Sequence, residues 1–324
     1  PIAVTDGSAS ARLAIAEAVT NLAGVPIGEI ERIKLSANWM CACGEDVEDV
    51  ALFRAVEAVG LEFCPQLGVA IPVGKDSLSM RTVWEDGDGR DHTVTAPMSL
   101  IVSAFAAVQD VRRVVTPDLK PGADTELLLV DLGAGRNRLG GSCLDQVFDR
   151  HGSDIPDVDA APLRSLFSLT QQLIDANLLL ACHDRSDGGL LATVAEMAFA
   201  GRRGVELTVQ AGDVLGELFA EEVGLLLQVR AADRDQIDAA IAGSGLTEMC
   251  RRMGRVNDDD ELRIVNTDGT SLYRGELADL HSAWSELTWR MQARRDEPTS
   301  AQEEYLTLGD RQDPGRQPVI AFEF

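Results

Sequence analysis

A polar, glycine-rich segment in the second half of the chain, His183-Asp184-Arg185-Ser186-Asp187-Gly188-Gly189, has the residue types that bind a phosphate group and its cation. A short apolar run, 178–182, precedes it, and a run with apolar residues at helical spacing begins at Leu190. This pattern predicts a buried strand, a turn and a helix, in that order.

The polar residues of this turn suit a nucleotide. Ser186 or Asp187 is expected to cap the helix, and the adjacent glycines let backbone N–H groups approach a ligand closely. Unpaired N–H groups and the positive dipole end of a helix N-terminus favour phosphate. Asp184 offers an oxygen ligand to the Mg²⁺ that accompanies a nucleotide. Taken alone, the residues fit an ordinary capped helix after an ordinary strand at least as well.

A pair of possible oxygen ligands lies near the N-terminus. Residues 8–23 predict a helix with Ile15 and Val19 on its apolar face. Glu17 and Asn21, four residues apart, share the opposite face and could present two oxygen atoms to one cation. A polar face that contacts only solvent is the alternative for this pair.

A third candidate, Gly74-Lys75-Asp76-Ser77-Leu78-Ser79-Met80, directly follows a predicted strand at 69–73. A backbone N–H, one lysine charge and hydroxyl donors at the end of a strand suit a phosphate. The G-x-x-x-x-G-K-[ST] spacing of a P-loop is absent, and a simple polar turn is the alternative.

The composition restricts the classes of function. The chain has 324 residues and a formal net charge of −24, which argues against nucleic acid as a partner. No apolar run approaches the roughly 20 residues that cross a bilayer, and no signal-peptide pattern opens the chain. We therefore expect a cytoplasmic protein without a membrane partner. The six cysteines show no zinc-site spacing and are expected to be free thiols.

The elements that must position these residues form two predicted units, divided at 116–122. In the first unit we expect, besides the helix at 8–23, a strand at 30–35, a polar turn at 36–40, a helix at 48–63, a strand at 69–73, a hairpin of 79–84 with 92–98, and a strand at 100–108.

In the second unit strands and helices are mixed, which is typical of an α+β domain. Strands are expected at 126–132, 178–182, 205–209, 225–229, 249–256 and 261–266, and helices at 139–151, 160–177, 190–200, 233–242 and 276–295. A Gly-rich turn at 133–137 lacks the full dinucleotide fingerprint. After Pro298 an irregular connector is expected, and residues 319–324 read as the start of another strand.

Several segments together resemble one family, the large phosphoribosylformylglycinamidine synthases of purine biosynthesis. They are residues 33–40, 72–80 and 183–190, with a continuation at 196–201. The likeness covers essentially the whole chain and concerns the C-terminal half of the synthetase region. It implies an α+β fold with an aminoimidazole-ribonucleotide-synthetase-like A domain over 1–115, lacking its first strands, and a B domain over 116–275. Residues 276–324 would then be a helix and connector toward an absent glutaminase domain.

The resemblance also implies roles for individual residues. By position, Glu17, Asn21 and Asp184 match metal ligands of the family and Ser186 matches a nucleotide contact, in a site for Mg²⁺ with ATP or ADP. A further aspartate ligand of the family would precede Pro1, so this site should be incomplete. The segment containing Gly74, Lys75, Asp76 and Ser77 resembles a loop facing substrate or phosphate.

The family is expected to make formylglycinamidine ribonucleotide from formylglycinamide ribonucleotide, ATP and glutamine-derived ammonia. ATP phosphorylates the amide oxygen of the substrate, and ammonia then displaces the phosphate. The catalytic histidine and the glutaminase residues of the family belong to regions absent from this chain. The resemblance therefore assigns no catalytic residue here, and His183 is not that histidine.

Two main functions stay open at this point. The chain could be a working part of the ligase, active with the missing synthetase half and glutaminase, its own nucleotide site being auxiliary. It could instead be a non-catalytic nucleotide-binding module when isolated, whose ADP and Mg²⁺ hold the A/B interface. A related enzyme of the aminoimidazole ribonucleotide synthetase type is a weaker third alternative. A fragment of this kind should expose a sheet edge and apolar surface and be poorly soluble.

Overall fold

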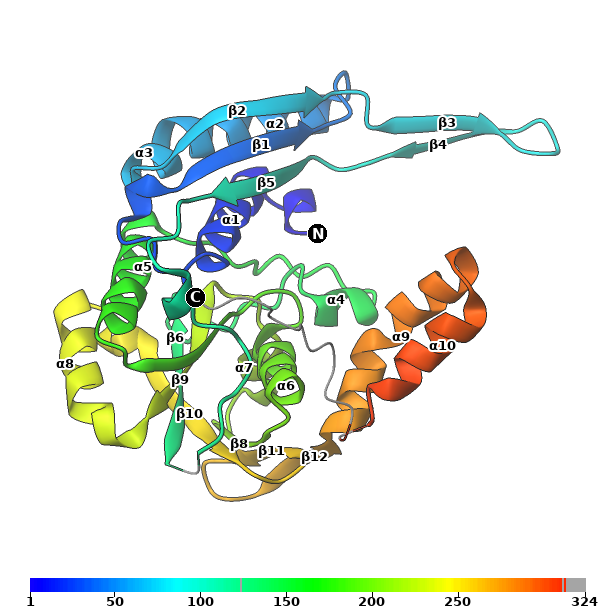
Figure 1. Cartoon of the computed structure of the whole chain (residues 1–324). Coiled ribbons are helices and arrows are strands. Elements are labelled where there is room, and N and C mark those ends of the chain that lie inside the picture. The colour runs from blue at the N-terminus through cyan, green and yellow to red at the C-terminus, as the bar shows by residue number, and fades with distance from the viewer. Residues whose placement is uncertain (123, 311, 313–324) are drawn as a thin grey trace, which may run out of the picture.

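The computed structural model describes residues 1–122, 124–310 and 312, and its helices pack around a three-stranded and a seven-stranded sheet (Figure 1). The first part of the chain contains α1 (Gly7–Thr20), β1 (Lys34–Met40), α2 (Asp46–Glu57), α3 (Cys64–Leu67), β2 (Ala70–Ser77), β3 (Arg81–Glu85), β4 (Asp91–Thr95) and β5 (Ser99–Phe105). No helix among the described residues is long and apolar enough to span a membrane.

The second part contains the larger sheet and the helices that cover it. Its elements are β6 (Thr125–Asp131), α4 (Cys143–Val147), α5 (Ala160–Asp175), β7 (Leu179–Asp184), α6 (Gly189–Gly201), β8 (Gly204–Val209), α7 (Val214–Phe219), β9 (Gly224–Arg230), α8 (Arg234–Ser244), β10 (Cys250–Asn257), β11 (Glu261–Asn266), β12 (Ser271–Glu276), α9 (Leu277–Arg295) and α10 (Pro298–Thr307). The mixture of helices and strands confirms the expected α+β class.

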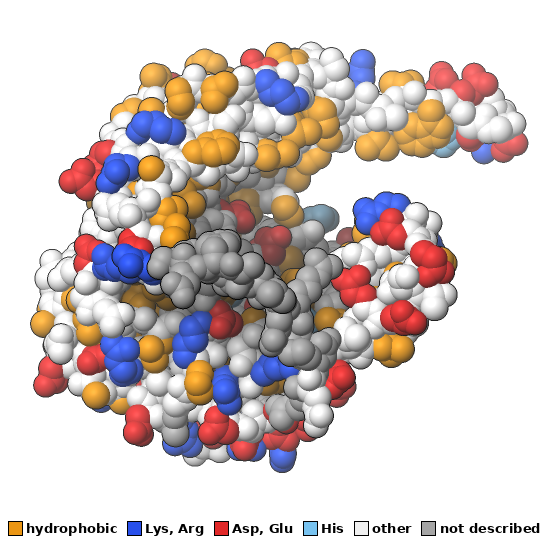
Figure 2. Space-filling model, viewed as in Figure 1, with side chains coloured by type: hydrophobic (Ala, Val, Ile, Leu, Met, Phe, Trp, Pro, Cys, Tyr) orange, Lys and Arg blue, Asp and Glu red, His pale blue; other side chains and the backbone are white. Residues whose placement is uncertain are grey.

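The small sheet has the order β2-β1-β5, with β1 parallel to β2 and antiparallel to β5. One face is covered, because Leu35 of β1 is buried in the same core as Ile15 of α1 and Ala55 of α2. The other face is open, and it exposes Ile101 and Phe105 of β5 by 53% and 60%. The hairpin β3–β4 extends beyond this sheet and also carries apolar side chains, which Figure 2 shows in orange.

The large sheet has the order β12-β11-β8-β10-β6-β9-β7 and is buried on both faces at its centre. The sequence of strand β6 is almost continuously apolar because both of its faces are buried. Leu128 and Val130 pack on the side of α5, α8 and α1, while Leu127 and Leu129 pack on the side of α6. Each fully buried leucine contributes about 1.5–3 kcal/mol relative to exposure.

The two parts of the chain share contacts that fix α1 against the large sheet. Gln171 of α5 is buried, and its side-chain oxygen accepts from the backbone N–H groups of Ile27 and Gly28, both at 2.8 Å. Arg12 of α1 donates twice to the carboxylate of Asp157, at 2.8 and 2.7 Å. The apolar core that contains Ile15 of α1 continues into α5. These contacts hold the outer surface of α1 in place relative to β7.

Most expected elements are confirmed, with two corrections in the first part. The strand expected at 30–35 begins only at Lys34, after a 3₁₀ turn at Ile30–Arg32, and it includes the expected polar turn at 36–40. Asn38 and Trp39 pair with Ile101 and Leu100 of β5, so sheet pairing overrides their local preference. The helix expected at 48–63 ends at Glu57 and continues as a π-helical stretch, Ala58–Phe63.

Two further corrections concern the second part. The helix expected at 139–151 is reduced to α4, because Gly141 has a positive φ of 77° and Ser142 begins the helix as its N-cap. The irregular connector expected after Pro298 is a helix, α10, in which Glu297 accepts from the N–H groups of Thr299 and Ser300. Pro298 lies in its first turn, where a proline is favoured. The strand expected at 319–324 lies outside the described residues.

Candidate functional site

Asp184 is the last residue of β7 and stands at the edge of the large sheet, with its side chain only 11% exposed. Ser186 donates its hydroxyl to one carboxylate oxygen, Oδ2. The other oxygen, Oδ1, lies 3.1 Å from Nδ1 of His183. Burial by itself would raise the pKa of Asp184, but these hydrogen bonds and the neighbouring imidazole lower it overall, so the group is a carboxylate.

His183 lies between two carboxylates. Its Nε2 is 3.0 Å from Oε2 of Glu196 on α6, while its Nδ1 faces Asp184. Burial would lower the pKa of the imidazole, but the hydrogen bonds to Asp184 and Glu196 raise it to about 9. His183 is therefore a cation at neutral pH, and it balances part of the negative charge at this turn.

The helix that follows begins differently from the prediction. Gly188 is the N-cap of α6, with a φ of 83°, and neither Ser186 nor Asp187 caps the helix with its side chain. The backbone N–H of Gly188 instead donates to Oε1 of Glu221, at 2.8 Å. Glu221 also accepts from the N–H of Cys143 at 2.8 Å. A protein carboxylate therefore already lies at the positive end of α6.

Several carboxylates gather at this helix end from distant parts of the chain. Glu17 of α1 keeps an exposed surface, but partial desolvation and the negative charges of Asp187, Asp184 and Glu221 raise its pKa. The pKa of Glu221 is raised as well, mainly by burial. The Sγ of Cys143 and carboxylate oxygens of Asp187 and Glu221 all lie within 4.8 Å of one another.

The carboxylates of this group, but not the thiol of Cys143, fit a hard divalent cation. Carboxylate oxygens are the ligands that Mg²⁺ prefers, and a cation would relieve the mutual repulsion that raises the pKa of Glu17. Asn21 is the exposed C-cap residue of α1, and its side-chain nitrogen donates to the carbonyl of Glu17 at 3.0 Å. Its predicted role as a ligand stays a prediction, as does the contact of Ser186 with a nucleotide.

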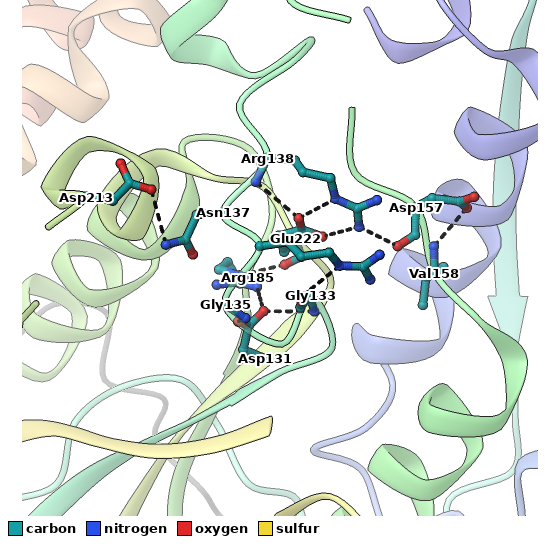
Figure 3. A network of polar contacts seen from close by, with 11 residues as sticks. Asp131, Gly133, Gly135, Asn137, Arg138, Asp157, Val158, Arg185, Asp213 and Glu222 are labelled. Carbon is teal, nitrogen blue, oxygen red and sulfur yellow. Dashed lines mark hydrogen bonds and ion pairs between the residues drawn. The ribbon is translucent and has the colours of Figure 1, made fainter. Parts of the chain in front are cut away.

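A buried network of polar contacts holds the turn after β7 in place (Figure 3). The side chain of Arg185 is 1% exposed; it donates to the carboxylate of Asp131 and, at 2.6 Å, to the carbonyl of Glu222. Asp131 also accepts from the N–H groups of Gly133 and Gly135, at 2.9 and 2.8 Å. The Gly-rich turn after β6 is thereby tied to the turn after β7.

The same network extends to α1. The side chain of Glu222 is 1% exposed and accepts two hydrogen bonds from the Arg138 guanidinium, both at 2.7 Å. Arg138 also donates to the carbonyl of Asp157 at 2.9 Å, and the carboxylate of Asp157 holds Arg12 of α1. Rigid ion pairs thus connect the helix that carries Glu17 with the segment that carries Glu221.

Glu221, Glu222 and Arg138 are site residues that the sequence did not predict. A signal existed in the two adjacent glutamates that directly precede the fully buried strand β9, since two acidic residues at the edge of a core need partners. The partners, however, come from other turns of the chain. Only the folded structure shows that Glu221 faces α6 while Glu222 pairs with Arg138.

The segment Gly74-Lys75-Asp76-Ser77 is not a loop, because all four residues belong to β2. Gly74 pairs with Ala37, and a Cβ atom at Gly74 would lie 2.3 Å from the Ala37 carbonyl oxygen, so glycine is required for the approach of two strands. Lys75 lies opposite Asn38, and Ser77 bonds both, accepting from Lys75 Nζ at 3.0 Å and donating to Asn38 Oδ1 at 3.4 Å.

Two family models match the chain. Residues 1–107 match the FGAR-AT PurM_N-like domain, and residues 126–266 match the C-terminal domain of AIR synthase related proteins. Together they confirm the expected α+β fold with an aminoimidazole-ribonucleotide-synthetase-like pair of domains.

Solved structures share the fold at low sequence identity. T. maritima PurL complexed with FGAR matches at 11% identity and a TM-score of 0.60, covering 86% of this chain and 44% of that one. T. maritima PurL complexed with ATP matches at 12% identity and a TM-score of 0.55, covering 81% of this chain and 40% of that one. E. coli HypE, a hydrogenase maturation protein, matches at 20% identity and a TM-score of 0.58, covering 81% of this chain and 78% of that one. This chain therefore spans less than half the length of the PurL chains that it matches.

Proposed function

We propose that this chain, which belongs to the PurM-like synthetase family, forms part of an ATP-dependent ligase. The proposed reaction converts formylglycinamide ribonucleotide into formylglycinamidine ribonucleotide, with ammonia derived from glutamine. ATP phosphorylates the amide oxygen, ammonia attacks the amide carbon, and phosphate leaves. The share of this chain in the reaction is a site for Mg²⁺ and ATP or ADP at the end of β7.

One observation carries the proposal. Desolvation raises the pKa of Glu17 on α1, and the nearby charges of Asp187, Asp184 and Glu221 raise it further. These carboxylates come from both parts of the chain and repel one another at one helix terminus. A divalent cation would offset that repulsion. PurL of T. maritima has structures in complex with FGAR and with ATP, and this supports the same ligands here.

Each residue of the proposed Mg²⁺–nucleotide site has a role of its own. Glu17, Asn21 and Asp184 would hold Mg²⁺, which neutralises the phosphate charge of the nucleotide bound at this auxiliary site. His183 and Ser186 fix the two oxygens of Asp184. The buried pair of Arg185 and Asp131 keeps the turn rigid, so that the ligands need no rearrangement when the nucleotide binds.

The remainder of the active cavity would come from a second synthetase half. The open face of the small sheet supports this, because it carries exposed apolar side chains beside Lys75 and Ser77. We assign these two residues and their neighbours Gly74 and Asp76 to the substrate- or phosphate-facing surface. The proposed partners are thus the other synthetase half and a glutaminase domain, and the proposed location is the cytoplasm.

A second function has an observation of its own. Glu17 and Asp184 belong to different parts of the chain, so a bound cation and nucleotide would tie α1 to the large sheet. The isolated chain could therefore act as a non-catalytic nucleotide-binding module. A related enzyme of the aminoimidazole ribonucleotide synthetase type is the further alternative, since E. coli HypE has the same fold over 81% of this chain.

Calorimetric titration with ADP tests the site. We expect the wild-type chain to bind ADP much more tightly when Mg²⁺ is present, and Asp184→Ala to abolish that gain. Asp235→Ala is the matched control, because Asp235 is an exposed carboxylate on α8, on a different helix from the site. Equal binding with and without Mg²⁺, or unchanged binding by Asp184→Ala, would remove the basis of the proposal.

A further inference from the structure

A continuous path of hydrogen bonds runs from α9 to Asp184. The indole N–H of Trp284 donates to Oε1 of Glu196 at 2.7 Å. The second oxygen of Glu196, Oε2, lies 3.0 Å from Nε2 of His183, whose Nδ1 lies 3.1 Å from Oδ1 of Asp184. The path thus joins a helix near the end of the described chain to the residue that ends β7.

Glu196, His183 and Asp184 each use both of their polar side-chain atoms. Glu196 uses one oxygen for Trp284 and the other for His183, and the imidazole uses one nitrogen for each carboxylate. Ser186 occupies the second oxygen of Asp184. Rotation of the Glu196 carboxylate or of the His183 ring would therefore break two hydrogen bonds at once. The path is stiff, and its orientation depends on where the indole lies.

Aromatic packing decides where the indole lies. Phe199, one turn after Glu196 on α6, stacks on His281 of α9 with ring centroids 4.3 Å apart and an angle of 7° between the planes. Trp284 also contacts the Phe199 ring; the two ring centroids are 5.6 Å apart, and the ring planes meet at 56°. These contacts dock α9 on α6 and aim the indole N–H at Glu196.

We propose that Trp284 is a positioning residue for the Mg²⁺–nucleotide site: through Glu196 and His183 it fixes the orientation of the Asp184 carboxylate. The docking of α9 then sets the affinity of the site for its cation. This inference rests on the proposed function, since it assumes that Asp184 binds the cation. Residues that orient a metal ligand in this way typically change metal affinity when they are altered.

The alternative is that Trp284 only packs against Phe199. The substitution Trp284→Phe separates the two roles, because it keeps an aromatic ring and removes the N–H donor. Trp284 is 58% exposed, so the change should leave the melting temperature almost unaltered. Trp289→Phe is the matched control on the same helix; its ring stacks on Tyr305 at 4.6 Å, and its N–H has no acceptor among the described residues.

The test is calorimetric titration of Mg²⁺–ADP into the wild type and these two variants. We expect Trp284→Phe to weaken binding about ten-fold, at the lower end of the effect of residues that orient metal ligands. Trp289→Phe should bind like the wild type. In a Glu196→Gln background, Trp284→Phe should weaken binding no further, because the path is already broken. Unchanged affinity in Trp284→Phe, or an equal loss in Trp289→Phe, would overturn the inference.

A second readout does not need the nucleotide. The ring-nitrogen NMR signals of His183 should shift in Trp284→Phe and stay in place in Trp289→Phe, since only the first variant disturbs Glu196. If the wild type fails to bind Mg²⁺–ADP, the proposed function fails, and the positioning role is then judged by these signals alone. Signals of His183 that do not respond to Trp284→Phe would contradict it.

Discussion

Glu221 accepts a hydrogen bond from the backbone N–H of Gly188 at 2.8 Å, so a carboxylate occupies the helix terminus that a phosphate would otherwise approach. Glu221→Gln keeps the acceptor and removes the charge. We expect the variant to bind ADP without Mg²⁺ about three- to ten-fold more tightly than the wild type, since each 1.4 kcal/mol of relieved repulsion is ten-fold in affinity. Isothermal titration in a chelator measures this. Weaker metal-free binding by the variant would contradict the explanation.

The two raised carboxyl pKa values predict that Mg²⁺ stabilises the chain in a pH-dependent way. Glu17 and Glu221 have pKa values above the ordinary 4.5, so these shifts cost no stability while both groups are protonated and destabilise the fold as pH rises through the raised pKa values. We expect Mg²⁺ to raise the melting temperature at about pH 8 and to have little effect at about pH 5. An equal shift at both pH values would show that the cation binds elsewhere.

The pKa of His183, raised to about 9, makes a separate prediction. The charged pairing with Asp184 and Glu196 stabilises the fold fully below pH 6.5, and this contribution is lost as pH rises through about 9. An NMR titration should find His183 near 9. His281 is an internal control, because burial lowers its pKa below 6.5. Titration of both histidines below 6.5 would mean that the pairing does not form in solution.

The buried pair of Arg185 and Asp131 should be essential for stability. Arg185→Met leaves a buried carboxylate without its cation, and we expect a loss of about 3–5 kcal/mol in the free energy of unfolding. Arg290→Ala removes an exposed pair with Glu286 on α9, at 2.6 Å, and should cost at most about 0.5 kcal/mol. Urea denaturation of both variants compares the two effects. Similar losses would argue against the buried network as the support of the turn.

Gly189 is required by its backbone conformation and by its surroundings. Its φ is +67°, and a Cβ atom there would lie 2.7 Å from the carbonyl carbon of Phe219. Gly189→Ala should therefore destabilise the chain and weaken nucleotide binding. A Cβ atom on Gly243 of α8 would meet no atom outside its own stretch of helix within 4 Å, so Gly243→Ala should stabilise the helix by about 0.5–1 kcal/mol. Thermal melting should show a lower melting temperature for Gly189→Ala and a higher one for Gly243→Ala.

The fold was predictable where a local pattern determines it. The apolar run at 225–229 and the apolar periodicity after Leu190 correspond to β9 and α6, because burial on one or both faces leaves a direct trace in sequence. The polar residues 36–40 and 74–77 were expected in turns, and both form strands. Their strand conformation comes from pairing between β1, β2 and β5, which local sequence does not reveal.

The candidate site was predictable only in part, for a similar reason. Asp184 at the end of a strand and Ser186 beside it follow from a strand–turn–helix pattern. The position of Glu221 does not, because it depends on the chain returning to the start of α6 after β8 and α7. The cap at Gly188 was likewise hidden, since serine and aspartate are the usual N-caps and here Ser186 bonds Asp184 instead.

The central claim is that Glu17 and Asp184, from two parts of the chain, bind one cation with a nucleotide. Crystals of the chain grown with Mn²⁺ and ADP test it directly, because Mn²⁺ takes oxygen ligands like Mg²⁺ and scatters anomalously. We predict one anomalous peak in contact with the carboxylates of both residues and with the ADP phosphates. A peak that touches neither carboxylate, or ADP bound at another surface, would contradict the account.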